Sequence, residues 1–364
     1  MLPFLYICLF LEALALGWAL TFLALKLAPR FGFMDRPGTR KVHLQTKPRL
    51  GGVGIYLAFV LVLAGNVFIA KADPLQWVSH YFPIPLHNIQ FVGRKLLAIL
   101  CGSFIVFSVG LIDDRRPLPP GIKFLAQIIA VAPLLYAGVQ IKGFLPLPAG
   151  AVLTVFWIVF LTNAFNFIDN MDGLCGGVAM LSLIVFAVLS YLSAQWFVVA
   201  IYVALAGALA GFLRYNWFPS KIFMGDAGAL SVGYLISSMS ILSTYYTKDT
   251  PTSLPILAPI VVLGLPIFDS LSVFAIRLRE KRPLWVGDTS HFSHRLVALG
   301  MTQKQAVLFI YLITLAMGLG ALPLRILPRP EAIYQITLVI LIFVAIAFLE
   351  AVGSSDPNRN RPHG

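Results

Sequence analysis

Residues 151–173 read AVLTVFWIVFLTNAFNFIDNMDG, an apolar run long enough to cross a bilayer that ends in a polar ladder. The ladder contains five amide or carboxylate side chains: Asn163, Asn166, Asp169, Asn170 and Asp172. On a continuous helix the three asparagines would share one face, because they are three and four residues apart, and the two aspartates would form a second pair. Burying such groups without partners costs several kcal/mol each. The ladder is therefore predicted to line a pocket that a metal, cations or a polar ligand fills.

The composition around this ladder is that of a membrane protein. Hydrophobic residues make up 59% of the chain, charged residues 12%, and the mean hydropathy is +0.87. The three cysteines, Cys8, Cys101 and Cys175, lie in apolar runs, so neither a disulfide framework nor a zinc site is indicated. The first basic residue is Lys26, and a cleavable signal needs basic residues before its apolar run. The N-terminal run is therefore expected to stay as a spanning helix.

Apolar runs near the ~20 residues that a spanning helix needs recur along the chain. Eleven spans are expected, at about 3–27, 51–70, 94–112, 121–140, 151–168, 174–192, 195–213, 228–246, 255–276, 304–322 and 331–351. The predicted fold class is an all-α polytopic membrane protein, with its two termini on opposite sides. One integral membrane domain is expected over 1–352, followed by a polar, disordered cytoplasmic tail over 353–364.

The basic residues predict the orientation. Of the 27 lysines and arginines, 20 fall in segments on one side of the expected bilayer, including loops 28–50 and 277–303. The positive-inside rule places these segments in the cytoplasm, the N-terminus outside and the C-terminus inside. A basic membrane face accounts for the net charge of +12, so no nucleic-acid partner is inferred.

Carboxylates are rare in this chain and gather at the same ends of the spans. They are Asp35, Asp113, Asp114, Asp169, Asp172, Asp226, Asp269 and Asp288. Asp269 and Glu12 are the acids that fall well inside spans. A transporter is expected to hold such groups near the bilayer midplane. A ring of acids at one face instead favours chemistry at the membrane surface.

Asp113 and Asp114 end the third span, just before Arg115. Adjacent helical residues point about 100° apart, so one carboxylate can serve a metal or act as a base while the other binds a basic partner. The alternative is a solvated helix end, although acids there oppose the helix dipole. Lys123 begins the next helix and can return a cation to the same pocket.

Asp226 follows Phe223-Met224-Gly225, just before the eighth span. In isolation it is explained equally well as an ordinary N-cap. A helix N-terminus also favours phosphate, and an aspartate there can hold Mg²⁺ while the metal bridges phosphate oxygens. The second interpretation is preferred because the other acids are predicted at the same face.

Two further loops carry cations. Lys41 and His43 precede a glycine-rich segment that permits close backbone approach to a ligand. His291 and His294 lie three residues apart, followed by Arg295, a set suited to phosphate binding or proton handling. A single interfacial histidine would more simply be explained by a ring that reaches toward water, but a pair with flanking charges favours a site.

Five motifs together resemble those of the polyprenyl-phosphate N-acetylhexosamine-1-phosphate transferases, of the undecaprenyl-phosphate N-acetylglucosaminyl-1-phosphate transferase type. They are Arg40-Lys41-x-His43…Pro48-Arg49-x-Gly51-Gly52, Asp113-Asp114, Asn163-x-x-Asn166-x-x-Asp169-x-x-Asp172-Gly173, Phe223-Met224-Gly225-Asp226 and Asp288-x-x-His291-x-x-His294-Arg295. All five occur in the family's order between about Met34 and Gly300, and their combination is specific although each motif alone is weak. Ser293 departs from the family pattern, which usually reads His-x-His-His in the last loop.

The resemblance implies transfer of a sugar-1-phosphate from a UDP-N-acetylhexosamine to undecaprenyl or another polyprenyl phosphate, with release of UMP, which starts a lipid-linked cell-envelope polysaccharide. The active site would face the cytoplasm at the bacterial inner membrane. Asp226 with Asn166 would hold Mg²⁺, or Mn²⁺ in its place. The catalytic residues implied are Asp113 as the base toward the lipid phosphate, Asp114 in its support, and His291. The substrate-binding residues implied are Lys41, His43, Lys123, Asn163, Asp169, Asp172, Phe223, His294 and Arg295, with Phe223 stacking on the uracil.

Three alternatives stay open. Within the enzyme class, the rival is the phospho-N-acetylmuramoyl-pentapeptide transferase of peptidoglycan synthesis, whose loop usually has three histidines and then an acid, where this chain has Arg295. An ion-coupled transporter would use Glu12 and Asp269. A non-catalytic scaffold would need no Mg²⁺. The exact amino sugar, the downstream polymer, a direct or phospho-enzyme mechanism, and the oligomeric state, for which a homodimer is one option, are left open.

Overall fold

The computed structural model describes residues 2–35, 46–71, 86–141, 146–246, 250–283 and 290–354. Lys41 and His43 of the predicted site, with Asp288 and most of the expected tail, lie outside these residues. The chain divides into two compact units, Met1–Tyr245 and Tyr246–Gly364. The expected single domain over 1–352 stays a prediction.

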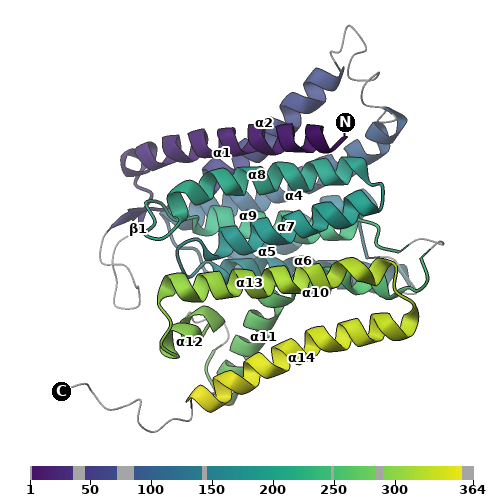
Figure 1. The fold of residues 1–364 in the computed structure, drawn as a ribbon. Helices are drawn as coiled ribbons and strands as arrows, with labels where there is room; N and C mark the ends of the chain where they lie inside the picture. The colour runs from purple at the N-terminus through teal and green to yellow at the C-terminus, as the bar shows by residue number, and fades with distance from the viewer. Residues whose placement is uncertain are drawn as a thin grey trace. The chain divides into compact units, whose positions relative to one another are not determined.

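The first unit is a bundle of long helices (Figure 1). Its elements are α1 (Leu2–Phe31), β1 (Met34–Asp35), β2 (Lys47–Pro48), α2 (Gly51–Lys71), α4 (Leu86–Arg115), α5 (Pro120–Tyr136), α6 (Leu147–Ile168), α7 (Leu174–Leu192), α8 (Trp196–Asn216) and α9 (Gly225–Leu242). The two short strands pair antiparallel, Met34 opposite Pro48 and Asp35 opposite Lys47.

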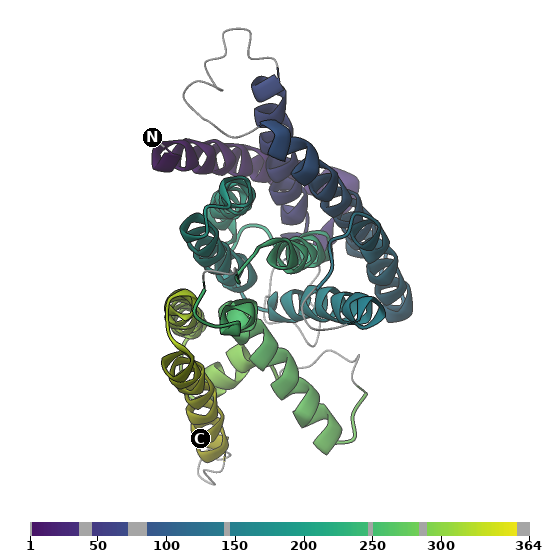
Figure 2. The same cartoon turned by 90° about the vertical axis from the view of Figure 1, so that its right-hand side faces the viewer.

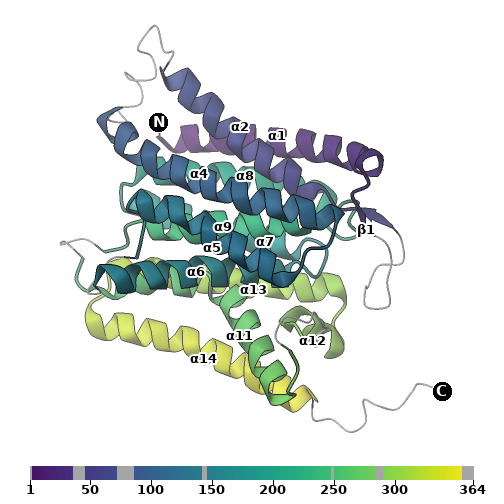
Figure 3. The ribbon, with the colours of Figure 1, turned by 180° about the vertical axis from the view of Figure 1, so that it is seen from behind.

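Helix α9 is the centre of this unit. Figures 1 and 3, taken from opposite sides, show α7 and α8 in front of it in one view and α4 and α5 in front of it in the other, and Figure 2 shows the teal helices of the unit nearly end-on. Every residue from Gly225 to Ser240 is buried. The helix is rich in glycine, alanine and serine, small residues that let neighbouring backbones approach closely where lipid supplies no hydrophobic drive.

Glycines at two crossings fix how close α9 lies to its neighbours. A Cβ added to Gly52 on α2 would lie 2.2 Å from the nitrogen of Gly228, and one added to Gly110 on α4 would lie 2.6 Å from atoms of Ala227. Both distances are far below van der Waals contact, so neither position accepts a side chain. These crossings bring the ends of α2 and α4 against the first turn of α9, where Asp226 lies.

The second unit consists of η1 (Leu254–Leu257), α10 (Ala258–Val262), α11 (Gly264–Arg279), α12 (Phe292–Ala298), α13 (Gln303–Ala321), η2 (Leu322–Arg325) and α14 (Arg329–Ser354). The single span expected at 255–276 is bent by 69° between α10 and α11. Pro266 lies in the first turn of α11, where its missing N–H costs nothing, but in a continuous helix it could not donate to the carbonyl of Val262 and its ring would clash with that carbonyl. A straight helix through this segment is therefore disfavoured.

The protein is an all-α, multi-pass membrane protein. Eight of the described helices are long and apolar enough to cross a bilayer, and the bent α10–α11 pair would make a ninth. Each of the eleven expected runs coincides with helical residues, but α5 has 17 residues and the polar small residues of α9 leave it outside the eight. The count of eleven and the orientation stay predictions.

The polar ladder does not form one helix, and that expectation is wrong. Helix α6 ends at Ile168, Asp169 leaves helical geometry at φ −79° and ψ 49°, and Gly173 adopts φ +78°. The Asn170 amide instead donates to the carbonyl of Phe167. Asparagine and aspartate side chains compete with the helix for backbone groups, and glycine accepts the left-handed turn without strain. The ladder's second half is thus a tight turn between α6 and α7.

Candidate active site

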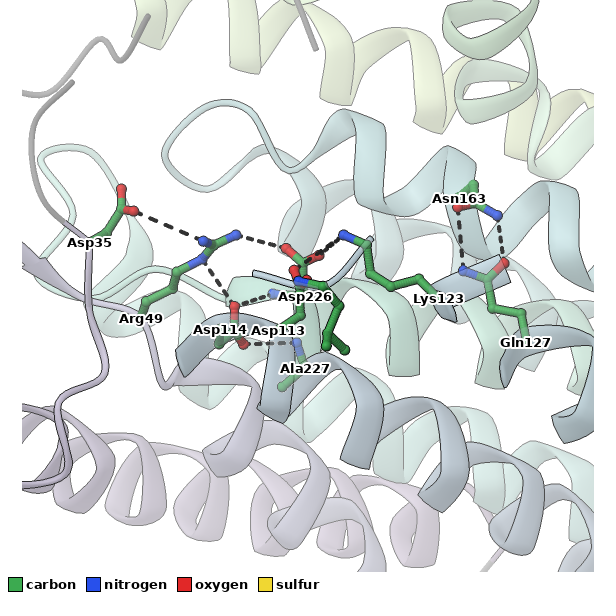
Figure 4. Close-up of polar contacts among 10 residues, drawn as sticks. Asp35, Arg49, Asp113, Asp114, Lys123, Gln127, Asn163, Asp226 and Ala227 are labelled. Carbon is green, nitrogen blue, oxygen red and sulfur yellow. Dashed lines mark hydrogen bonds and ion pairs between the residues drawn. The ribbon is translucent and has the colours of Figure 1, made fainter. Parts of the chain in front are cut away.

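Two carboxylates and one lysine meet where α4, α5 and α9 come together (Figure 4). Lys123 Nζ on α5 lies 2.9 Å from Asp226 Oδ2 and 3.2 Å from Asp113 Oδ2. The carboxyl groups of Asp113 and Asp226 are also within hydrogen-bonding reach of each other. The other oxygen of Asp113 accepts the N–H of Leu118 at 2.7 Å, which orients its carboxyl from the loop after α4. The cation expected from the start of the next helix does lie in this pocket.

Asp114 has a different set of contacts from its neighbour. Its oxygens accept the backbone N–H groups of Asp226 at 2.8 Å and Ala227 at 2.9 Å, and its side chain is 0% exposed. Asp226 is therefore not the N-cap of α9, because Asp114 satisfies the first N–H groups of that helix from α4. These contacts are those of a positioning residue: Asp114 holds the backbone that carries Asp226.

Arg49, expected only as one cation of a glycine-rich loop, lies among three carboxylates. Its Nε is 3.0 Å from Asp114 Oδ1, its Nη2 is 2.7 Å from Asp226 Oδ1, and its Nη1 is 4.0 Å from Asp35 Oδ1. Burial lowers the pKa of the guanidinium, but the carboxylates of Asp114 and Asp226 reverse this and raise the pKa above its ordinary value. Arg49 is thus a permanent positive charge in the cluster.

Backbone hydrogen bonds explain why Arg49 reaches the start of α9. The Pro48 carbonyl accepts the N–H of Phe223, the Phe223 carbonyl accepts the N–H of Gly51, and the Met224 carbonyl accepts the N–H of Gly52. The chain that leads into α2 is thereby bound to the chain that leads into α9 on both sides of Arg49. The spacing of the Pro-Arg-x-Gly-Gly motif is what allows this pairing.

Carboxylates outnumber cations in this cluster. Within the described residues, ion pairs link four carboxylates, Asp35, Asp113, Asp114 and Asp226, to two cations, Arg49 and Lys123. A fifth carboxylate, Asp169, lies close enough for the charge of Arg49 to lower its pKa. No group of three His, Cys, Asp or Glu side chains among those residues forms a ready metal cage. Mg²⁺ does not need one, because it commonly binds one or two carboxylates and completes its shell with water and substrate phosphate. The excess negative charge fits such an ion.

Asp169 ends α6 beside this cluster. Burial raises the pKa of its carboxyl to about 7, the Arg49 guanidinium partly offsets this effect, and the carboxylates of Asp226 and Asp172 add to it. Its charge therefore changes near neutral pH. A bound cation would favour the ionised form.

Asp172 lies in a second, smaller network. Its oxygens accept the backbone N–H of Ser220 at 2.9 Å and the Ser220 hydroxyl at 2.7 Å, and Lys47 Nζ lies 3.7 Å away. The same ammonium is 5.1 Å from the centroid of the Phe223 ring. Asp172 and Phe223 are therefore joined through one lysine, which keeps a cation over the aromatic face predicted to stack on a base.

The asparagines of the ladder separate. Asn163 and Gln127 exchange two amide hydrogen bonds of 2.6 and 3.3 Å, and Asn163 also donates to the carbonyl of Val159 (Figure 4). These contacts tie α6 to α5 and use much of the amide's capacity. Asn166 is half-buried, and its side chain makes no hydrogen bond with the described residues. It therefore has the donor and acceptor capacity that a ligand needs.

In the second unit, the histidine motif is held by helix α11. His291 Nδ1 lies 2.8 Å from Asp269 Oδ2, and Asp269 Oδ1 accepts the N–H of Phe292. Arg295 donates from Nη2 to the Ser272 hydroxyl at 2.9 Å and from Nη1 to the Ser290 carbonyl. His294 lies half-buried in the first turn of α12, beside the buried Ser293 that replaces the family's usual histidine.

Several residues that contact the predicted site residues in the structure were not predicted from the sequence. Arg49 had a usable signal in its motif, but Gln127, Ser220 and Lys47 carried none, because their partners lie far away in the chain. Asp269 was assigned to the transporter alternative because it falls inside a span. Its buried contact with His291 shows that it serves the histidine motif.

Comparisons with known proteins match the part of the chain that contains most of this carboxylate cluster. Residues 96–244, which begin within α4 and end just after α9, match the model of Glycosyl transferase family 4. A Bacillus subtilis protein described as a probable undecaprenyl-phosphate N-acetylglucosaminyl 1-phosphate transferase is 31% identical over 341 residues, which cover 90% of this chain and 85% of that protein. The chain belongs to the polyprenyl-phosphate N-acetylhexosamine-1-phosphate transferase family. The resemblance inferred from the five motifs is thus confirmed.

Other members of this transferase family match a similar extent. The decaprenyl-phosphate N-acetylglucosaminephosphotransferase of Mycobacterium tuberculosis is 30% identical over 328 residues, which cover 81% of this chain and 76% of that protein. The undecaprenyl-phosphate alpha-N-acetylglucosaminyl 1-phosphate transferase of Escherichia coli K12 is 26% identical over 315 residues, 82% of this chain and 78% of its own length. The similarity therefore extends beyond the carboxylate cluster to most of the chain.

Proposed function

We propose that this protein transfers N-acetylhexosamine-1-phosphate, most simply N-acetylglucosamine-1-phosphate, from a UDP-sugar to undecaprenyl phosphate. An oxygen of the lipid phosphate attacks the phosphorus that bears the sugar, the bond from that phosphorus to the UMP oxygen breaks, and UMP leaves. The product is a lipid diphosphate sugar that starts a cell-envelope polysaccharide. The observation that carries the proposal is the meeting of Asp113, Asp226, Lys123 and Arg49 at one point, because phosphoryl transfer needs charge neutralisation and positioning more than covalent help.

The chain's own residues divide the work as follows. Asp113 is the base toward the acceptor phosphate, since its carboxyl is anchored by Leu118 and shares Lys123 with Asp226. Asp114 supports it by holding the start of α9. Lys123 and Arg49 neutralise the phosphate oxygens on which charge gathers during transfer.

Mg²⁺, or Mn²⁺ in its place, completes the proposed site. Asp226 and Asn166 would hold it: Asp226 because it lies in the excess of carboxylates, and Asn166 because its amide makes no hydrogen bond with the described residues. When bound, the ion would polarise phosphate oxygens and screen their charge. Each oxygen of Asp226 contacts one cation, Arg49 or Lys123, and a carboxylate oxygen has a second lone pair that would be available to the ion.

The nucleotide is proposed to bind beside Phe223, with Asp169 and Asp172 near the uridine. Lys47 lies against both Phe223 and Asp172, and an uncharged base stacked on the ring would take the place of its ammonium. Arg295 stands where the muramoyl-pentapeptide branch usually has an acid, and its guanidinium is bound back to Ser272. We therefore favour a compact UDP-N-acetylhexosamine over the pentapeptide nucleotide as donor.

The site is proposed to face the cytoplasm of a bacterium at its inner membrane, because the basic segments lie on that side under the positive-inside rule. The lipid phosphate is presented there while its tail stays in hydrocarbon. A cysteine placed at Ser290, in a cysteine-free background, tests this orientation. It should stay unmodified when intact cells are treated with an impermeant thiol reagent and react after the cells are opened. Labelling in intact cells would overturn the orientation.

The central experiment measures UMP release by the purified protein with undecaprenyl phosphate, Mg²⁺ and a panel of UDP-sugars. UDP-N-acetylglucosamine should give the highest kcat/KM. Faster turnover of the muramoyl-pentapeptide donor would overturn the branch while keeping the reaction class. Glu12→Gln is the matched acid control, since Glu12 contacts Asn66 in α2 and is outside the cluster. Solute uptake by reconstituted vesicles that depends on Glu12, without UMP release, would instead support the transporter.

A further inference from the structure

Asp269 makes two directed contacts to consecutive residues of the histidine motif. One oxygen lies 2.8 Å from His291 Nδ1, and the other accepts the backbone N–H of Phe292 at 2.6 Å. The His291 and Asp269 side chains are 7% and 3% exposed. An imidazole held by one ring nitrogen, next to a backbone held by the same carboxylate, is fixed both in place and in rotation.

The contact also decides where the imidazole carries its hydrogen. An aspartate carboxylate only accepts hydrogen bonds, so Nδ1 of His291 must be the donor in the pair. In the neutral ring, Nε2 then keeps the lone pair, and when the ring is protonated Nε2 becomes a second donor. A carboxylate thus presents Nε2 in one defined chemical form, as orienting carboxylates do for catalytic histidines in other enzymes.

Helix α12 has other supports besides Asp269. The Arg295 guanidinium binds the Ser272 hydroxyl on α11, and the Phe292 ring packs edge-to-face on Phe268 with centroids 5.7 Å apart. The Ser272 hydroxyl in turn donates to the Asp269 backbone carbonyl, which a side-chain change leaves in place. The α11–α12 contact should therefore survive a conservative change of the Asp269 side chain.

We propose that Asp269 is a positioning residue for His291: it holds the ring with Nδ1 as donor, so that Nε2 can act on a phosphate or hydroxyl oxygen of the substrate. This inference rests on the proposed function and on the expectation, implied by the family resemblance, that His291 acts in the reaction. Asp269 itself touches neither substrate nor metal. Its role in the chain is to serve the histidine, and it is not an ion-coupling acid.

Asp269→Asn should keep the contact with the Phe292 N–H and change the contact with His291 Nδ1. The asparagine oxygen can still accept the Phe292 N–H, so the start of α12 keeps its partner. The amide nitrogen then faces His291 Nδ1 and donates to it, which forces the hydrogen onto Nε2. The ring stays where it was, but Nε2 loses its lone pair. We expect kcat for UMP release to fall at least ~10-fold, with KM for the UDP-sugar little changed.

A double-mutant cycle tests whether Asp269 acts through His291. Asp269→Asn is made in the wild-type chain and in a His291→Ala chain, and kcat, KM and the unfolding temperature are measured for all four. Ser270→Ala is the matched control, because Ser270 is the next residue on α11, is buried, and its hydroxyl has no hydrogen-bond partner among the described residues. This control should keep wild-type kcat. Asp269→Glu, which restores a carboxylate, should recover part of the activity lost by Asp269→Asn.

The expected result is a large loss of kcat for Asp269→Asn in the wild-type chain and no further loss in the His291→Ala chain, at unchanged unfolding temperature. An equal loss in both chains would overturn the proposal, as would unchanged kcat. If Asp269→Asn fails to fold, the same cycle run with Asp269→Glu decides, because an equal loss in both chains again excludes action through His291. Absence of UMP release by the wild-type protein would instead count against the proposed function itself.

Discussion

The junction of α4 with α9 and the junction of α11 with α12 use the same device for different purposes. In each, an aspartate on one helix accepts the backbone N–H groups that begin another helix: Asp114 serves α9, and Asp269 serves α12. The remaining capacity of each carboxylate holds one side chain. Asp114 holds Arg49, a permanent cation, whereas Asp269 holds the imidazole ring of His291.

The difference lies in what each junction can do. The first collects five carboxylates and two cations at the start of α9, which suits the binding of charged phosphate and metal. The second contributes one buried acid and one ring, which suits proton transfer or a single hydrogen bond. A helix whose first N–H groups are capped by an aspartate of another helix is therefore placed precisely. The side chain that the same aspartate also holds indicates the chemistry.

The largest effect is expected from Asp226→Asn. The first junction should keep its fold, because the cap of α9 is the Asp114 side chain and not that of Asp226. UMP release should fall at least ~10²-fold, since a catalytic metal contributes several kcal/mol of charge stabilisation. The measurement is steady-state UMP release at saturating Mg²⁺, with Glu12→Gln as the control. Activity near that of the wild type in a monodisperse sample would remove Asp226 from the metal site.

Asp113→Asn should separate binding from chemistry. Because its proposed role is to act on the acceptor phosphate, UDP-sugar should bind with near-normal affinity while UMP release almost disappears. Calorimetric titration of the donor and the UMP assay on the same sample measure the two quantities. Equal losses in both would make Asp113 a ligand-binding or structural residue.

Asp114→Asn should show that the first junction depends on its cap for stability as well as for activity. The new amide would face N–H donors or Arg49, leaving buried groups unpaired at a cost of about 1–3 kcal/mol. Displacement of Asp226 should lower kcat roughly tenfold. Unfolding in detergent and UMP release measure the two effects. The comparison with Asp269→Asn is direct: a lowered unfolding temperature for both variants, or for neither, would mean that the junctions do not differ as described.

The smallest effect is expected from Asp169→Asn. Its pKa of about 7 lies above the ordinary value near ~3.9, so the stability it provides is full below about pH 4 and is lost as pH rises through about 7. The metal-free variant should therefore show a flatter dependence of unfolding temperature on pH across this window. Melting curves of both proteins in chelator at several pH values measure it. Parallel curves would mean that Asp169 is already ionised in the native protein.

Much of the local structure was predictable. Each expected apolar run coincides with helical residues, and Lys123 lies beside Asp113 as its position after the α4–α5 turn suggested. Hydrophobic runs and short turns depend on residues that are close together in the chain, so the sequence alone indicates them. The ladder at 163–173 was misjudged because its spacing fits a helix, whereas the tendency of asparagine, aspartate and glycine to form turns decided its shape.

The sequence by itself determined the class of protein and the family, because composition and motif order need no partner to be recognised. Only the tertiary structure decided that Asp114 caps α9 while Asp113 faces the cluster. It also decided that Arg49 joins Asp114 to Asp226, that Lys123 joins Asp113 to Asp226, and that Asp269 contacts His291. Arg49 and Asp226 are 177 positions apart, and Asp269 and His291 are 22 apart on separate helices. The first pair forms because the small residues of α9 let α2 approach it closely, and the second forms because α12 packs against α11. Pair geometry of this kind depends on the whole bundle, and no local pattern encodes it.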